Sequence, residues 1–78
     1  MGWKEQFFEG AATRKTDASN PNLIIFGIAP VGYDTPEGWA SNVWILYGTR
    51  TSDGTEVHAN GDILPNKSWD NRGGFKYT

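Results

Sequence analysis

Apolar side chains concentrate in two segments in the middle of the chain. Residues 23–29 (LIIFGIA) are apolar on both faces of an extended chain, and Pro30 follows them, which is typical of a strand that ends there. Residues 43–51 alternate in the manner of a strand, and their first half is again apolar on both faces. Strands of this kind need cover on both sides. The pattern therefore predicts two largely buried strands, at 23–29 and 43–51.

Turn-forming pairs divide the second half of the chain. Asp-Gly at 53–54 and Asn-Gly at 60–61 supply the positive φ angles that tight hairpins require, and they bracket a short strand at 55–59. Residues 75–78 alternate aromatic and polar side chains and are expected to close the sheet at its edge. We therefore expect an α+β or mainly β chain built on a four- to five-stranded antiparallel meander, either an open sheet or a small barrel.

The first segment of the chain has the spacing of a helix. Trp3, Phe7 and Phe8 lie on one face of a 3.6-residue period, which predicts a short amphipathic helix over residues 1–12. Two or three turns are marginal in isolation, so this helix has to pack on something else. Residues 13–22 hold no large apolar side chain and contain an Asn-Pro pair, and we interpret them as a surface loop.

Length and composition favour a single small domain. The 78 residues divide into the helix 1–12, the loop 13–22, a sheet over 23–64 and a basic, aromatic tail over 65–78. Cysteine is absent and there is one histidine, which excludes disulfides, thiolate zinc sites and a histidine-rich metal cage. We therefore expect neither a metal nor a cofactor. Four Trp, four Phe and three Tyr suit an aromatic core or an adhesive surface equally well.

Charge is distributed unevenly along the chain. Residues 1–62 carry four basic and eight acidic side chains, whereas residues 63–78 carry three basic and one acidic, so opposite ends of two identical copies attract each other. The overall charge of −2 gives no general attraction to nucleic acid. The longest apolar run is too short to cross a membrane, and the first residues lack the apolar core of a signal peptide. We expect no membrane association and a cytoplasmic or virion location.

Few side chains of this sequence are of the types that support catalysis. His58 has a carboxylate two positions away at Glu56, on the same face of the predicted strand, and a second one nearby at Asp62. Asp34 and Glu37 share a loop with aromatic side chains, a composition found in sugar-cleaving sites. The same residues also have a simpler, structural interpretation: His58 is a solvated histidine on a hairpin, and Asp34 caps a turn. We therefore predict that the chain is not an enzyme.

Aromatic and basic side chains alternate near the end of the chain. Trp69, Arg72, Lys76 and Tyr77 form a pattern that suits stacking on sugar rings or on single-stranded nucleic acid, although a closing strand with one buried face looks similar. The loop over 30–41 adds further rings, and loops of this length are often functional.

The two predicted central strands have apolar side chains on both faces, and the rest of the chain has too few apolar segments to cover both. Either its own loops or another chain covers the second face, because monomers rarely expose so large an apolar patch. Our first hypothesis is a non-enzymatic interaction or assembly protein that docks onto identical copies or a larger complex such as a virion. The alternative is an aromatic ligand-binding module for carbohydrate or, less favoured, single-stranded nucleic acid. The candidate interaction residues are Trp3, Phe7, Phe8, Tyr33, Trp39, Trp69, Arg72, Lys76 and Tyr77.

Overall fold

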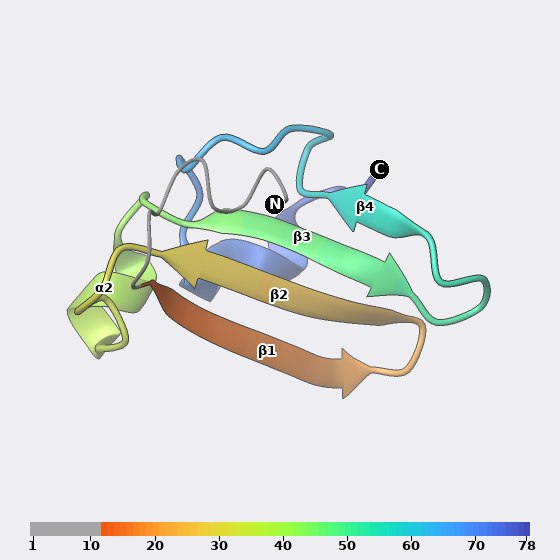
Figure 1. Cartoon of the computed structure of the whole chain (residues 1–78), viewed down its shortest axis with the longest axis horizontal. Coiled ribbons are helices and arrows are strands. Elements are labelled where there is room, and N and C mark those ends of the chain that lie inside the picture. The colour runs from red at the N-terminus through yellow and green to blue at the C-terminus, as the bar shows by residue number, and fades with distance from the viewer. Residues whose placement is uncertain (1–11) are drawn as a thin grey trace.

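The computed structural model describes residues 12–78, which form an open, twisted antiparallel sheet with helical segments on one side (Figure 1). Its strand order β1-β2-β3-β4 follows the sequence, as in a meander. The antiparallel meander is therefore confirmed, whereas the small-barrel alternative is wrong, because the sheet in this part of the chain does not close. The strands are β1 (Thr13–Asn20), β2 (Leu23–Ala29), β3 (Ile45–Arg50) and β4 (Glu56–His58).

The two apolar segments form the centre of the sheet. Strand β2 has the predicted bounds, and β3 lies within the predicted 43–51. The turn between β3 and β4 uses Gly54 at a φ of +74°, as the Asp-Gly pair predicts. Asn60 and Gly61 also adopt positive φ angles, but no strand follows them, and the later chain meets the sheet only at the isolated bridges of Lys67 with Trp44 and of Tyr77 with Ala59. The predicted sheet over 23–64 therefore extends too far at its end.

Strand β1 corrects the prediction of a loop over 13–22. It pairs with β2 from Thr13 opposite Ala29 to Asn20 opposite Leu23, with an irregularity after Asp17. Among the described strands β1 lies at the edge of the sheet, with only β2 beside it, and its side chains apart from Ala18 are polar on both faces. Such a strand is held by its hydrogen bonds to β2 and lacks the apolar alternation on which the prediction relied.

The loop predicted over 30–41 contains a short helix, α2 (Pro36–Ala40), at the end of the sheet where β2 ends and β3 begins (Figure 1). Its N-cap is Thr35, whose hydroxyl accepts a hydrogen bond from the Gly38 N–H at 3.1 Å. The amphipathic helix predicted over 1–12 falls, except for its last residue, outside the described residues. Within residues 12–78, no helix is both long and apolar enough to cross a membrane.

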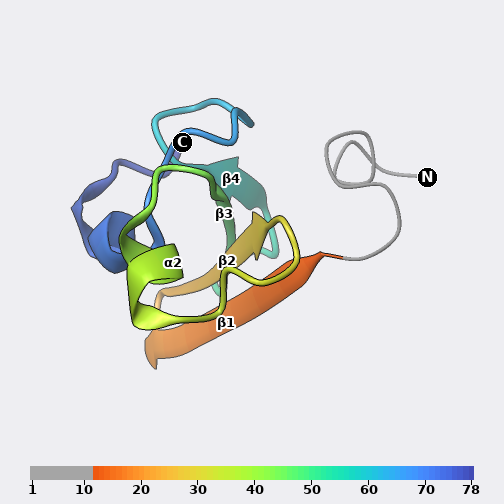
Figure 2. The same ribbon diagram turned by 90° about the vertical axis from the view of Figure 1, so that its left-hand side faces the viewer.

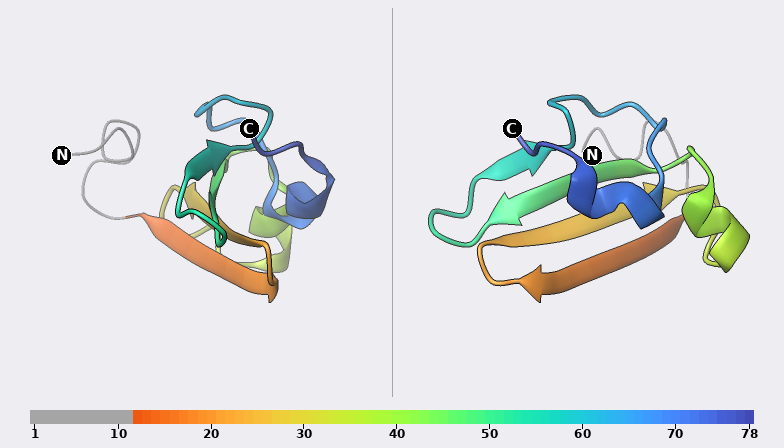
Figure 3. Two further views of the ribbon diagram at one scale, coloured as in Figure 1. Left: turned by 90° about the vertical axis from the view of Figure 1, so that its right-hand side faces the viewer. Right: turned by 180° about the vertical axis from the view of Figure 1, so that it is seen from behind.

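The end of the chain crosses one face of the sheet. Part of the predicted basic, aromatic tail over 65–78 forms the 3₁₀ helix η1 (Trp69–Gly74), which lies over the sheet in the right-hand view of Figure 3. The expected closing strand at 75–78 is reduced to a bridge between Ala59 and Tyr77, flanked by reciprocal backbone hydrogen bonds of 3.0 Å between His58 and Thr78. This end therefore tethers η1 to β4 and does not extend the sheet by a full strand.

The two faces of the sheet have different cover. We call the face that η1 crosses the inner face and the opposite one the outer face; Figure 2 shows η1 to one side of the strands. The main core lies on the inner face, where Trp44, Leu46 and Ala59 are completely buried. On the outer face, Phe26 and Tyr47 are half-buried, and their rings stack with centroids 5.1 Å apart.

Candidate functional site

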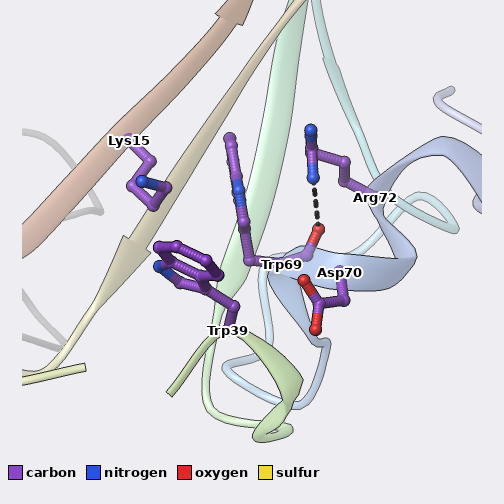
Figure 4. Close-up of a pocket in the computed structure, with 5 residues that line it drawn as sticks. All are labelled: Lys15, Trp39, Trp69, Asp70 and Arg72. Carbon is purple, nitrogen blue, oxygen red and sulfur yellow. Dashed lines mark hydrogen bonds between the residues drawn. The ribbon is translucent and has the colours of Figure 1, made fainter. Parts of the chain in front are cut away.

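A pocket of about 330 Å³ opens on the inner side of the sheet, between β1, α2 and η1 (Figure 4). Two indole rings and three charged side chains line it, and they come from three elements that are far apart in the sequence. The lining residues are Lys15, Trp39, Trp69, Asp70 and Arg72.

Trp69 lies flat against the sheet because β2 has a glycine beneath it. A Cβ atom added to Gly27 would lie 2.6 Å from Trp69 Cε3 and 3.0 Å from Trp44 Cε3, which is too close for packed atoms. The rings of Trp44 and Trp69 pack with centroids 5.7 Å apart. Since Lys15 is the partner of Gly27 in the β1–β2 register, its side chain starts next to the Trp69 ring.

A backbone bridge brings Trp69 to this position. The N–H of Trp44 donates to the carbonyl of Lys67 at 2.8 Å, and the N–H of Lys67 donates back to the carbonyl of Trp44 at 3.1 Å. The Lys67 side chain is buried, and its ammonium pairs with Asp62 and donates to Asn66 Oδ1. These contacts fix the chain two residues before Trp69 and so determine where η1 begins.

Trp39 is held by the loop that precedes α2. Its indole Nε1–H donates to Asp34 Oδ1 at 2.9 Å. A Cβ atom on Gly38 would lie 2.1 Å from the carbonyl oxygen of Tyr33, so the tight packing of α2 on this loop requires glycine. Asp34 was predicted to cap the turn, but the cap is Thr35, and the Asp34 carboxylate orients Trp39 instead.

The Lys15 ammonium lies beside both tryptophans. Its Nζ is 4.9 Å from the ring centroid of Trp39 and 5.8 Å from that of Trp69, distances at which a cation is attracted by the aromatic face. The same nitrogen donates to Asp34 Oδ1 at 3.0 Å. Hydrogen bonds from Trp39 and then from Lys15 hold the pKa of the Asp34 carboxyl below its usual value. Asp34 therefore stays ionised and ties β1 to the loop before α2.

Arg72 packs on the other side of the Trp69 ring, with its guanidinium carbon 4.5 Å from the centroid (Figure 4). Its Nε donates to Asp17 Oδ2 at 2.8 Å, and its Nη1 donates to the Trp69 carbonyl at 3.1 Å. Hydrogen bonds from Ser19, and after them the one from Arg72, lower the pKa of Asp17 to about 2. The Asp17–Arg72 pair thus ties η1 to β1 across the inner face.

Tyr77 supports the pocket without lining it. Its hydroxyl donates to the backbone carbonyl of Arg72 at 2.8 Å, and burial raises the pKa of this phenol to about 12. This hydrogen bond holds the backbone of Arg72 in place and so helps to position its guanidinium at the pocket.

The predicted interaction residues separate into three groups. Trp39, Trp69 and Arg72 come together in the pocket. Tyr33 and Tyr77 pack against the core, and Lys76 is exposed outside the pocket. The remaining candidates, Trp3, Phe7 and Phe8, lie outside the described residues.

Sequence reasoning missed Lys15 and Asp70 as lining residues. Lys15 was assigned to a loop, and its place in the pocket follows from its register opposite Gly27. Asp70 directly follows Trp69 and was grouped with a basic tail. The local sequence carries no signal for the inward-facing positions Lys15 and Asp17, because the residues that alternate with them are polar as well.

Of the candidate catalytic groups, Asp34 contacts the pocket through Lys15 and Trp39, whereas the histidine lies elsewhere. His58 Nε2 is 3.1 Å from Glu56 Oε2, and the pairing of His58 with Tyr47 places both on the outer face, away from the pocket. Within residues 12–78, no group of three or more histidine and carboxylate side chains is arranged to hold a metal ion.

Comparison with known proteins gives no relative to guide the interpretation. No family model, no curated protein and no solved structure matches this chain. The functional argument therefore rests on the pocket and the sheet faces themselves.

Proposed function

We propose that this chain is a non-enzymatic binding module and that its binding site is the pocket between Trp39 and Trp69. The observation that carries the proposal is the convergence of two indole rings with Lys15 and Arg72 around a pocket of about 330 Å³. Concave sites with aromatic walls and a few placed polar groups are the usual form of ligand pockets. A ligand with a flat or ring-shaped part would stack on the indole and use the charged groups to fix its orientation.

The geometry supports binding in preference to catalysis. A general acid near neutral pH needs a raised pKa, whereas the pKa of Asp34 is lowered by its hydrogen bonds to Trp39 and Lys15. His58 belongs to the outer face, on the opposite side of the sheet from the pocket. The pocket groups therefore suit recognition.

Isothermal titration calorimetry with the purified chain tests this function. The titrants are neutral oligosaccharides, acidic oligosaccharides and an oligothymidylate, which cover the ring-bearing ligand classes. We expect at least one to bind, and Trp39→Ala to weaken that binding by about tenfold, the order of loss seen when a stacking ring is removed. Lys76→Gln, outside the pocket, serves as the control. Binding that survives Trp39→Ala unchanged, or no binding by any titrant, would contradict the proposal.

A second candidate function is assembly through the outer face. Phe26 and Tyr47 are paired in the β2–β3 register, and with Ile24 they form a half-buried apolar stripe. The part of this stripe that remains exposed is apolar surface that a second chain could cover. We propose this face as the docking surface if the chain works within a larger assembly, of its own copies or of a virion. Sedimentation at micromolar concentration tests it: self-association that Phe26→Ser abolishes supports docking of identical copies, and a strict monomer removes that version of the proposal.

A further inference from the structure

We infer that the ligand of the pocket is an uncharged saccharide, held with one sugar ring against Trp39 and its hydroxyls on Lys15, Arg72 and Asp70. This inference rests on the proposed function and deepens it by naming the ligand class. It follows from the charges around the pocket, from the hydrogen-bonding groups that remain available, and from the size of the pocket.

The charges around the pocket offset one another. Lys15 is paired with Asp34 and Arg72 with Asp17, at 3.0 and 2.8 Å. Asp70 adds a further negative charge to the lining. A phosphate-bearing ligand gains most of its affinity from unpaired positive charge, and this pocket does not offer it. With both cations paired and the charge of Asp70 in excess, the surroundings disfavour an anionic ligand.

The same side chains keep many hydrogen-bonding groups available. A lysine ammonium has three N–H donors and an arginine guanidinium has five. Within the described residues, the hydrogen bonds take up one donor of Lys15 and two of Arg72. Asp70 is exposed at the rim and contributes acceptor oxygens. Sugar hydroxyls donate and accept at once, so they match a lining that mixes donors with a carboxylate.

The aromatic part of the pocket suits a sugar ring. Trp39 is half-buried and held in place by its hydrogen bond to Asp34, so it presents an oriented apolar surface at the pocket. Trp69 is 5% exposed and packs between Trp44 and Arg72, so it forms the floor. A volume of about 330 Å³ lies at the small end of ligand sites, which fits one or two sugar units and excludes a longer buried chain.

Substitution of Asp70 separates a sugar from an anionic ligand, because the two respond in opposite directions. We expect Asp70→Asn to weaken the binding of a neutral sugar by about three- to tenfold, the cost of replacing a charged acceptor with a neutral one. An acidic saccharide or an oligonucleotide would instead bind Asp70→Asn more tightly, because a repelling charge is removed. Lys76→Gln is the matched control, since it changes the net charge outside the pocket.

The experiment is calorimetry with cellotetraose, maltotetraose, mannotetraose and the tetramer of N-acetylglucosamine, beside tetragalacturonate and oligothymidylate. We expect one of the neutral sugars to bind with a Trp39→Ala loss of about tenfold, and with little change between about 50 and 500 mM sodium chloride. Circular dichroism of each variant shows whether it is folded; if Trp39→Ala unfolds, Trp39→Leu replaces it.

The outcomes distinguish the two proposals. If only tetragalacturonate or oligothymidylate binds in a Trp39-dependent way, and salt weakens it, the pocket is a binding site but the inference of a neutral sugar is overturned. If no titrant binds in a Trp39-dependent way, both the inference and the proposed function fail. Binding of a neutral sugar that Asp70→Asn leaves unchanged would overturn the assigned role of the carboxylate and with it the arrangement inferred here.

Discussion

The two faces of the sheet both carry aromatic rings, but the rings are fixed in different ways. On the inner face, Trp44 is completely buried, its indole N–H donates to the Gly38 carbonyl at 2.9 Å, and Trp69 packs over Gly27. On the outer face, Phe26 and Tyr47 are half-buried and stack on each other. The comparison teaches that burial, hydrogen bonding and the glycine beneath the rings separate a structural aromatic cluster from an accessible one.

Loss of an inner-face ring should have the largest effect on stability. Trp44→Ala removes a fully buried side chain and one of the two hydrogen bonds that the Gly38 carbonyl accepts, the other coming from the Ser41 N–H, so we expect a loss of about 3–5 kcal/mol. That is comparable with the total stability of a domain of this size, and the variant should be largely unfolded. Urea unfolding followed by circular dichroism measures it. A cooperative transition at the wild-type midpoint would mean that the inner face is not the core.

The glycine beneath Trp69 should be the next most sensitive position. Gly27→Ala places a methyl group where Trp69 and Trp44 already lie, so either the rings or the strand must shift. We expect a loss of about 1–3 kcal/mol, the range for overpacking a core. A substitution that leaves both the midpoint and the near-ultraviolet tryptophan signal unchanged would contradict the packing described here.

The outer face should respond less to the same kind of change. The apolar pattern of 23–29 suggests full burial of Phe26, and hence a loss of 3–5 kcal/mol on truncation, but the ring is only half-buried. We therefore expect Phe26→Ala to cost about 1–2 kcal/mol, roughly in proportion to the area it buries. If this variant were as unstable as Trp44→Ala, the two faces would not differ as described.

Acid should weaken the tie between η1 and β1. The pKa of Asp17 is lowered to about 2, whereas an unfolded aspartate titrates near 3.9, so the folded state favours the ionised form. The resulting stability is present above about pH 4 and is lost as the pH falls toward 2; we expect about 1–2 kcal/mol. Urea unfolding at several pH values measures it. Asp17→Asn should lack this part of the acid dependence, and an identical pH profile for both proteins would refute the assignment.

The centre of the sheet was predictable because its signals are local. An unbroken apolar run identifies β2, and an Asp-Gly pair identifies the turn between β3 and β4. Strand β1 was not predictable in this way, because an edge strand of polar residues is held by pairing with β2 and has no apolar period. The burial of Lys67 and Trp69 within the predicted basic, aromatic tail over 65–78 was not predictable from composition either.

The pocket could be predicted in part. Trp39, Trp69 and Arg72 were selected because rings and cations near turns often meet ligands, and they do line one pocket. These residues are brought together by two long-range contacts: the register of β1 against Gly27 and the bridge between Trp44 and Lys67. A sequence can suggest the residue types of such a site, but the side chain of Lys15 joins it only once the sheet is formed.

The most direct test of the central claim, that the inner-face pocket is the binding site, is a nuclear magnetic resonance titration. The probe is the oligosaccharide that binds most tightly in calorimetry, added to ¹⁵N-labelled protein. The account predicts shifts at the indole N–H of Trp39 and Trp69 and at the backbone amides of Lys15, Asp70 and Arg72, with the amides of Phe26 and Tyr47 unchanged. Shifts concentrated on the outer face, or none at the two indoles, would contradict it.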